Sequence, residues 1–202
     1  MEKIKNTPPV PPLIKGGEEG VPGDRVSSET IHIALLSAYA VGLHSIESLI
    51  PTPVPWLRLG LANIITLTTL YLYGLRAGMI VTFTRVIIRS LLAGTFLGPA
   101  FVMSLGGGVA STLVMWALIV VFRRLFGPVT VSIFGALTHN IVQLFLAHFL
   151  FVRRIEAILI ISPVILGAGL VTGIFNGIVT SLIIKKIQEK KEATRVAENS
   201  LP

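Results

Sequence analysis

Long apolar runs separated by short polar or proline-containing stretches dominate the chain from residue 29 onward. Five of the six runs have a length within the range of about 17–25 residues with which a helix crosses a bilayer, and the last is slightly longer. They cover residues 29–50, 56–73, 77–98, 100–122, 129–151 and 158–184. The break at Gly74–Arg76 is short enough to be a tight turn. This pattern predicts an all-α polytopic membrane protein with six transmembrane helices.

The two ends of the chain lack this pattern. Residues 1–28 are rich in Pro, Gly and charge, which predicts a disordered leader, whereas residues 29–186 form the predicted transmembrane domain and residues 187–202 a charged C-terminal tail. Six spans place both termini on one side of the cell membrane. That side holds more Lys and Arg, so the positive-inside rule predicts that both termini are cytoplasmic. Arg153 and Arg154 fall on the other side and oppose this assignment.

Composition supports a membrane protein and changes the interpretation of the positive charge. The chain is 52% hydrophobic and 13% charged, and a soluble domain carries about 25% charged residues. The net charge of +7 lies in the tails and between apolar runs, which favours anionic lipid over nucleic acid as the partner. The sequence has no cysteine, which excludes disulfides, thiolate metal sites and cysteine nucleophiles.

The third run contains two arginines well inside its ends. Arg85 and Arg89 are four residues apart, so both lie on one side of a helix, one turn apart. Each Arg near the middle of a span costs roughly 2.5–3.5 kcal/mol on insertion scales. Glu156 belongs to a predicted loop, so Glu47 is the one carboxylate of the predicted spans that could pair with them. Either the arginines snorkel or pair internally, or an anionic ligand binds them.

Other polar side chains occur at membrane depth in the predicted spans. Asn140 and Gln143 are three residues apart and therefore share a helix face. Such groups either hydrogen-bond across helices or surround a polar or anionic small molecule. The candidate substrate-binding residues are Arg89, Arg85, Asn140, Gln143, Glu47, Asn63 and His139, and Asn176 is a further buried amide.

Small residues recur at helical spacing. Gly169, Gly173, Gly177 and Ser181 follow one another every four residues in the last run, which predicts close helix packing. The run Gly106–Gly108 predicts a close contact, a kink or backbone lining a cavity.

No set of residues with recognisable catalytic or metal-binding chemistry emerges. His44 and Glu47 are three apart, but without further ligands they favour hydrogen bonding over metal binding, so no metal or cofactor is expected. The sequence has one Asp, Asp24 in the leader, and no phosphate-binding loop of the ATPase type. The chain is therefore not expected to be an enzyme by itself.

Three segments resemble a known membrane family. Residues 60–74, 85–108 and 135–144 are similar to the heptaprenyl diphosphate synthase component I family, also called the Gx transporter family. The enzyme name implies elongation of prenyl diphosphates, a reaction for which catalytic subunits use two Asp-rich motifs that hold Mg²⁺. One Asp cannot supply these motifs, so this name leaves the role of an accessory membrane subunit.

The transporter name implies a different role. The chain resembles the substrate-binding S component of energy-coupling factor (ECF) transporters, which works with a coupling transmembrane subunit and an ATPase pair. In that family an Ala-xxx-Ala motif on the first helix docks the coupling subunit, and Ala34 and Ala38 stand in the matching place. The resemblance also implicates residues 51–55, Asn140 and Gln143 in the substrate pocket, and implies transport by tilting of the bundle.

Overall fold

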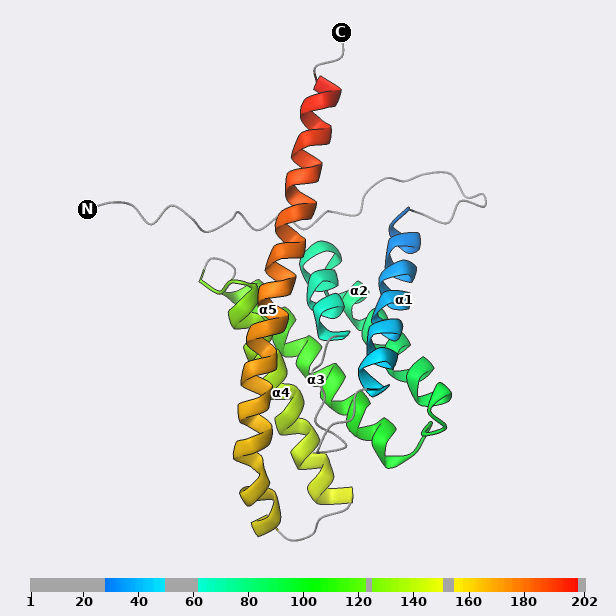
Figure 1. Ribbon diagram of the computed structural model, residues 1–202, viewed down its shortest axis with the longest axis vertical. Coiled ribbons are helices and arrows are strands. Elements are labelled where there is room, and N and C mark those ends of the chain that lie inside the picture. Colours follow the sequence, from blue (N-terminus) through cyan, green and yellow to red (C-terminus); the bar gives the residue numbers. More distant parts are fainter. Residues whose placement is uncertain (1–27, 50–61, 123–124, 151–154, 200–202) are drawn as a thin grey trace, which may run out of the picture.

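The structure, a computed structural model, describes residues 28–49, 62–122, 125–150 and 155–199, and in these ranges it contains helices and turns without a strand. Five helices follow one another in the chain: α1 (Ser28–Leu49), α2 (Ala62–Leu92), α3 (Pro99–Val121), α4 (Pro128–Leu150) and α5 (Ile155–Asn199). They form one bundle (Figure 1). The predicted all-α class is confirmed.

Several helices have the length and composition of membrane spans. In the described part of the chain these are Ala62–Leu92, Pro99–Val121, Pro128–Leu150 and Ile158–Lys190, and α1 adds the shorter apolar stretch Ser28–Leu43. The chain is thus a helical membrane protein. The predicted count of six spans is not confirmed by these four. α2 covers parts of two predicted runs, and the predicted break between them is present, because Gly74 has non-helical dihedral angles (φ 78°, ψ −168°).

Some boundaries differ from the prediction or lie beyond the described ranges. α5 begins before the predicted residue 158 and does not end at Ile184, because the charged segment that follows continues the helix to Asn199. Residues 1–27 of the predicted leader, the segment Pro51–Pro55 and the start of the predicted second run at Trp56 lie outside the described residues, whereas Ser28, the last residue of the predicted leader, begins α1.

The helices alternate in direction along the bundle (Figure 1). The first residues of α1 and the last residues of α5 lie at the same end, and α5 extends well past the other helices there. This arrangement agrees with an even number of crossings. The assignment of that end to the cytoplasm stays a prediction.

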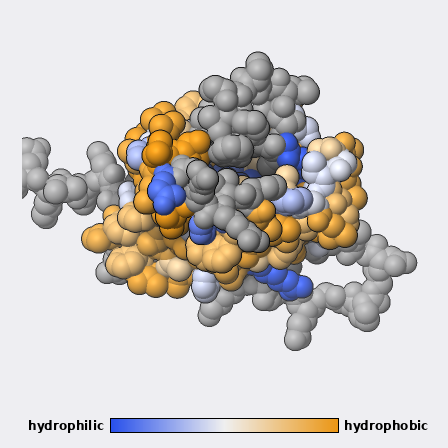
Figure 2. Space-filling model, turned by 90° about the horizontal axis from the view of Figure 1, so that it is seen from below, coloured by the Kyte–Doolittle hydropathy of each residue, from blue (hydrophilic) through white to orange (hydrophobic). Residues whose placement is uncertain are grey.

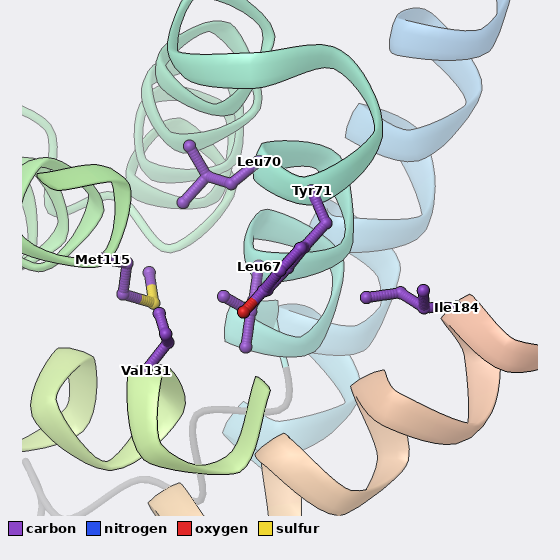
Figure 3. Packing of buried hydrophobic residues seen from close by; sticks show 6 residues of the cluster. All are labelled: Leu67, Leu70, Tyr71, Met115, Val131 and Ile184. Carbon is purple, nitrogen blue, oxygen red and sulfur yellow. The ribbon is translucent and has the colours of Figure 1, made fainter. Parts of the chain in front are cut away.

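Hydrophobic side chains fill the bundle near the end from which α5 extends. The cluster takes residues from four helices, and Figure 3 shows them pointing into a common interior: Leu67, Leu70, Tyr71, Met115, Val131 and Ile184. Elsewhere the interior is unusually polar, with buried Thr, Ser, Asn and Arg side chains. Large apolar side chains cover much of the outside, and the view from below is mostly hydrophobic around its rim (Figure 2). A surface of this kind is suited to a lipid environment.

The glycine stripe of α5 packs on α4. A Cβ atom at Gly173 would lie 2.9 Å from Cα of Ile133, and one at Gly177 would lie 2.5 Å from Cα of Val129. The two backbones therefore approach more closely than any larger residue would permit. The predicted packing role of this stripe is confirmed.

Candidate functional site

α2 folds back on itself at Gly74 and places Arg85 beside Asn63. A positive φ is readily adopted by glycine, so the reversal falls on the residue that tolerates it. Leu70 and Gly78 are four residues before and four residues after Gly74, and they lie against each other. A Cβ at Gly78 would come within 2.5 Å of the Leu70 Cδ2 atom. Eleven residues to either side, Arg85 Nη2 donates a hydrogen bond to Asn63 Oδ1 at 2.9 Å. The two halves of α2 are thus an antiparallel helical hairpin.

The Arg85 side chain is held inside the bundle. It is only 3% exposed. A Cβ at Gly108 of α3 would lie 3.7 Å from its Nη2 atom, an ordinary van der Waals distance, so the guanidinium group lies against this part of α3. Arg85 therefore does not snorkel to the surface, and its hydrogen bond to Asn63 is an internal pairing.

A hydroxyl pair joins α2 to α3 one turn away from Arg85. Thr82 Oγ1 and Thr112 Oγ1 are 2.9 Å apart. Thr112 donates its single hydroxyl proton to the carbonyl of Gly108 at 2.8 Å. Thr82 must then be the donor within the pair. The sequence pattern gives no signal for these two threonines, because hydroxyls that bond to their own helix are common in apolar spans.

α4 contributes His139 and Gln143 to the same stretch of α3. A Cβ at Gly107 would lie 3.0 Å from His139 Nδ1 and 3.2 Å from Gln143 Cγ. Gly107 and Gly108 are consecutive and point about 100° apart on the helix, so the α4 side chains and Arg85 contact neighbouring faces of α3. Of the three interpretations of the Gly106–Gly108 run, close contact is the one observed, and α3 is helical throughout the run.

Asn140 points toward a different helix from Gln143. Its Nδ2 group donates to the carbonyl of Ile165 in α5 at 3.0 Å, and it also lies against Gly169. Asn140 therefore contacts α5 and Gln143 contacts α3, although their spacing predicts that they share one face of α4. Asn140 occupies an interhelical contact in this structure.

α5 adds two buried polar residues that face α2. Thr180 Oγ1 donates to the carbonyl of Ile64 at 3.5 Å, which places it beside the residue that follows Asn63. Asn176 is 2% exposed and lies one turn earlier on the same face of α5. We name the set Asn63, Arg85, Gly107, Gly108, His139, Gln143 and Asn176 the polar cluster.

Two predicted site residues lie toward the end of the bundle opposite the chain termini. Arg89 is half-buried, one turn beyond Arg85 in α2. Glu47 belongs to α1, but its side chain and that of His44 lie outside the described side chains, so the predicted pairing of Glu47 with an arginine is not tested. Among the described residues no group of three or more potential metal ligands occurs.

The predicted docking residues lie on the outer surface of α1. Ala34 and Ala38 are both exposed, and Gly42 continues the same line, where a Cβ atom would meet no other atom within 4 Å. Exposed Ile31, Leu35 and Tyr39 surround them. This face of α1 is apolar, and small residues form a line along it.

Fold and buried polar residues together define a class: a polytopic helical membrane protein whose interior holds a buried arginine hydrogen-bonded to an asparagine. The chain belongs to the heptaprenyl diphosphate synthase component I family, whose sequence profile matches residues 36–183. The matched region contains every member of the polar cluster. Comparison with curated proteins and with solved structures gives no match.

Proposed function

We propose that this chain is a membrane subunit that captures a small polar or anionic molecule at the polar cluster. The observation that carries the proposal is Arg85, which is 3% exposed and oriented by the Asn63 amide. An ionisable residue inside a membrane-spanning bundle is costly and typically marks a substrate or ion site. Gln143 and His139 of α4 add hydrogen-bonding groups beside Gly107, the residue of α3 that precedes Gly108.

Capture is proposed to serve transport of the energy-coupling factor type. The exposed line Ala34, Ala38 and Gly42 supports this, because small residues let a second helix approach closely. A coupling transmembrane subunit would dock there, and an ATPase pair would power tilting of the bundle. This chain would act as the substrate-binding S component and would not catalyse a reaction itself.

The family description favours a second candidate function. The chain would then be an accessory membrane subunit of heptaprenyl diphosphate synthase, with Arg85 and Arg89 holding a diphosphate group. Guanidinium groups suit phosphate oxygens in geometry and charge. An Asp-rich soluble synthase would supply the catalytic Mg²⁺ site.

Ligand capture is tested on the purified full-length protein. Native mass spectrometry should detect a retained small molecule in the wild type and in Arg76→Gln, an exposed arginine of the same helix. Arg85→Gln should lose the molecule, and Arg89→Ala should weaken its retention. Equal retention in Arg85→Gln and Arg76→Gln would reject capture at the polar cluster.

The partner distinguishes the two functions. Copurification with an ATPase pair and a coupling subunit supports transport, whereas copurification with an Asp-rich soluble synthase supports the accessory role. For transport, combined Ala34→Leu and Ala38→Leu should release the coupling subunit while leaving the retained ligand in place. Ala117→Leu, on the exposed surface of α3, is the matched control and should leave the complex intact.

A further inference from the structure

Apolar side chains cover the turn that joins α2 to α3. Leu92 is 73% exposed and Leu97 is 75% exposed, and Leu91 and Phe96 are also exposed. The sequence has no charged residue between Arg89 and Arg123. We propose that residues 91–98, the α2–α3 turn, are inserted into the bilayer, so that this end of the bundle contacts lipid acyl chains and does not emerge into water.

The length of the second half of α2 supports insertion. Arg76 is exposed beside the reversal at Gly74, and its charge places that end of the helix at the membrane surface. Leu92 is sixteen residues further on, a rise of about 24 Å. The hydrocarbon core is about 30 Å thick, and any tilt of the helix shortens the rise across it. The C-terminal end of α2 at Leu92 therefore lies within the hydrocarbon core and does not reach its far surface.

The backbone of the turn supplies many of its own hydrogen-bond partners. Gly94 has φ 64° and closes α2, with the Thr95 amide donating to the Ser90 carbonyl at 2.9 Å and the Gly94 amide to the Leu91 carbonyl at 3.2 Å. The Ala93 amide donates to the Arg89 carbonyl and the Gly98 amide to the Thr95 carbonyl, and Pro99 has no amide hydrogen. Four amides of the turn are thus bonded to backbone carbonyls without water.

The turn at the other end of α3 provides a contrast. Leu125 is 76% exposed, nearly the same as Leu97, but it directly follows Arg123 and Arg124 in the sequence. Two consecutive arginines favour the headgroup region. Leu97 and Leu125 are therefore about equally exposed. The uncharged sequence around Leu97 favours the hydrocarbon, whereas the two arginines before Leu125 favour the headgroup region.

The arrangement of the helices agrees with an inserted turn. Along the long axis of the molecule, the α2–α3 turn stops short of the lower ends of α4 and α5 (Figure 1). The second half of α2 also runs obliquely to α5 in this view. A bundle whose α4 and α5 reach the far surface would leave the α2–α3 turn below that surface.

Spin labelling tests the insertion directly, since the chain has no native cysteine. Leu97→Cys and Leu125→Cys are each made in the full chain, labelled with a nitroxide and reconstituted in phosphatidylethanolamine–phosphatidylglycerol vesicles. Collision rates are measured with oxygen, which concentrates in hydrocarbon, and with a neutral nickel chelate, which stays in water. At residue 97 the ratio of oxygen to nickel accessibility should exceed that at residue 125 at least severalfold.

Two results would overturn the proposal. Nickel accessibility at residue 97 equal to that at residue 125 would place the turn in water. Low accessibility to both reagents at residue 97 would mean that protein covers it. Leu92→Cys provides a second position on regular helix in case the substitution at Leu97 prevents folding, and it should give the same high ratio of oxygen to nickel accessibility.

Discussion

Arg85 and Asn63 are joined by a 2.9 Å hydrogen bond although 22 residues separate them in the chain. A straight helix would hold them about 33 Å apart. The bond therefore depends on the reversal at Gly74, from which each residue is eleven positions away. This hydrogen bond aligns the two halves of α2 with each other at the position of the buried Arg85 side chain.

Removing one partner of this hydrogen bond should lower the free energy of unfolding more than removing both partners. Asn63→Leu should lower the free energy of unfolding by about 1.5–3 kcal/mol, since a hydrogen bond to a charged group is lost while the guanidinium stays buried. Arg85→Met added to Asn63→Leu should restore part of that loss, because no buried charge then remains. Unfolding in mixed micelles measures each variant.

Arg76→Met is the control for these variants. It removes an exposed charge from the same helix and should change the unfolding free energy by less than about 0.5 kcal/mol. Strict additivity of Asn63→Leu and Arg85→Met would show that the two side chains do not act as a pair.

Two glycines of α5 should respond in opposite directions to alanine. At Gly177 the new methyl group would meet the Val129 Cα atom at 2.5 Å, so backbone must move, at about 1–3 kcal/mol. At Gly167 no atom lies within 4 Å, and alanine should stabilise the helix by up to about 1 kcal/mol. Thermal unfolding of both single variants checks this, and equal shifts would contradict the packing of α4 on α5.

Leu97 adopts a backbone conformation that favours glycine. Its φ of 60° lies in the left-handed region, which costs a residue with a side chain about 1–2 kcal/mol. Leu97→Gly removes this strain and loses about 0.5 kcal/mol of favourable leucine insertion. Glycine also gives the unfolded chain more backbone freedom, which costs roughly 0.5–1 kcal/mol. The net result should be a stabilisation of at most about 1 kcal/mol in unfolding measurements. Leu92→Gly, where φ is not positive, should give no gain, and a similar gain there would refute the strain argument.

Asn140 should matter for stability more than for ligand capture. Asn140→Ala removes the hydrogen bond to the Ile165 carbonyl, which for helices in membranes is worth about 0.6 kcal/mol on average and about 1.7 kcal/mol at most. Chemical unfolding in micelles should show a loss in this range while native mass spectrometry still detects the retained molecule. Loss of the molecule at unchanged stability would instead place Asn140 in the binding site.

The sequence pattern was sufficient for the helical class and for the breaks between apolar runs. Gly74 was identified as a break because glycine and a following charged residue interrupt an otherwise apolar stretch. The close packing of Gly169, Gly173 and Gly177 followed from their spacing alone. These features are local, and local composition determines them.

The partners of the polar side chains could not be predicted in the same way. Asn140 and Gln143 share a face by spacing, yet one contacts α5 and the other α3, because α4 lies between these two helices. Arg85 was expected to snorkel, pair with a carboxylate or bind a ligand, and its amide partner depended on the hairpin. Such contacts depend on how the helices are arranged. The spacing of residues within one helix carries no information about that arrangement.

The continuation of α5 beyond the bundle has a mechanical consequence. From Lys185 to Asn199 the helix rises about 21 Å, and the pair Lys185 and Glu189, 3.8 Å apart, lies at its base. Because the same helix runs through the bundle, a rotation of the whole protein by about 10° would move the far end by about 4 Å. A fluorophore there would report reorientation of the membrane domain from the aqueous side.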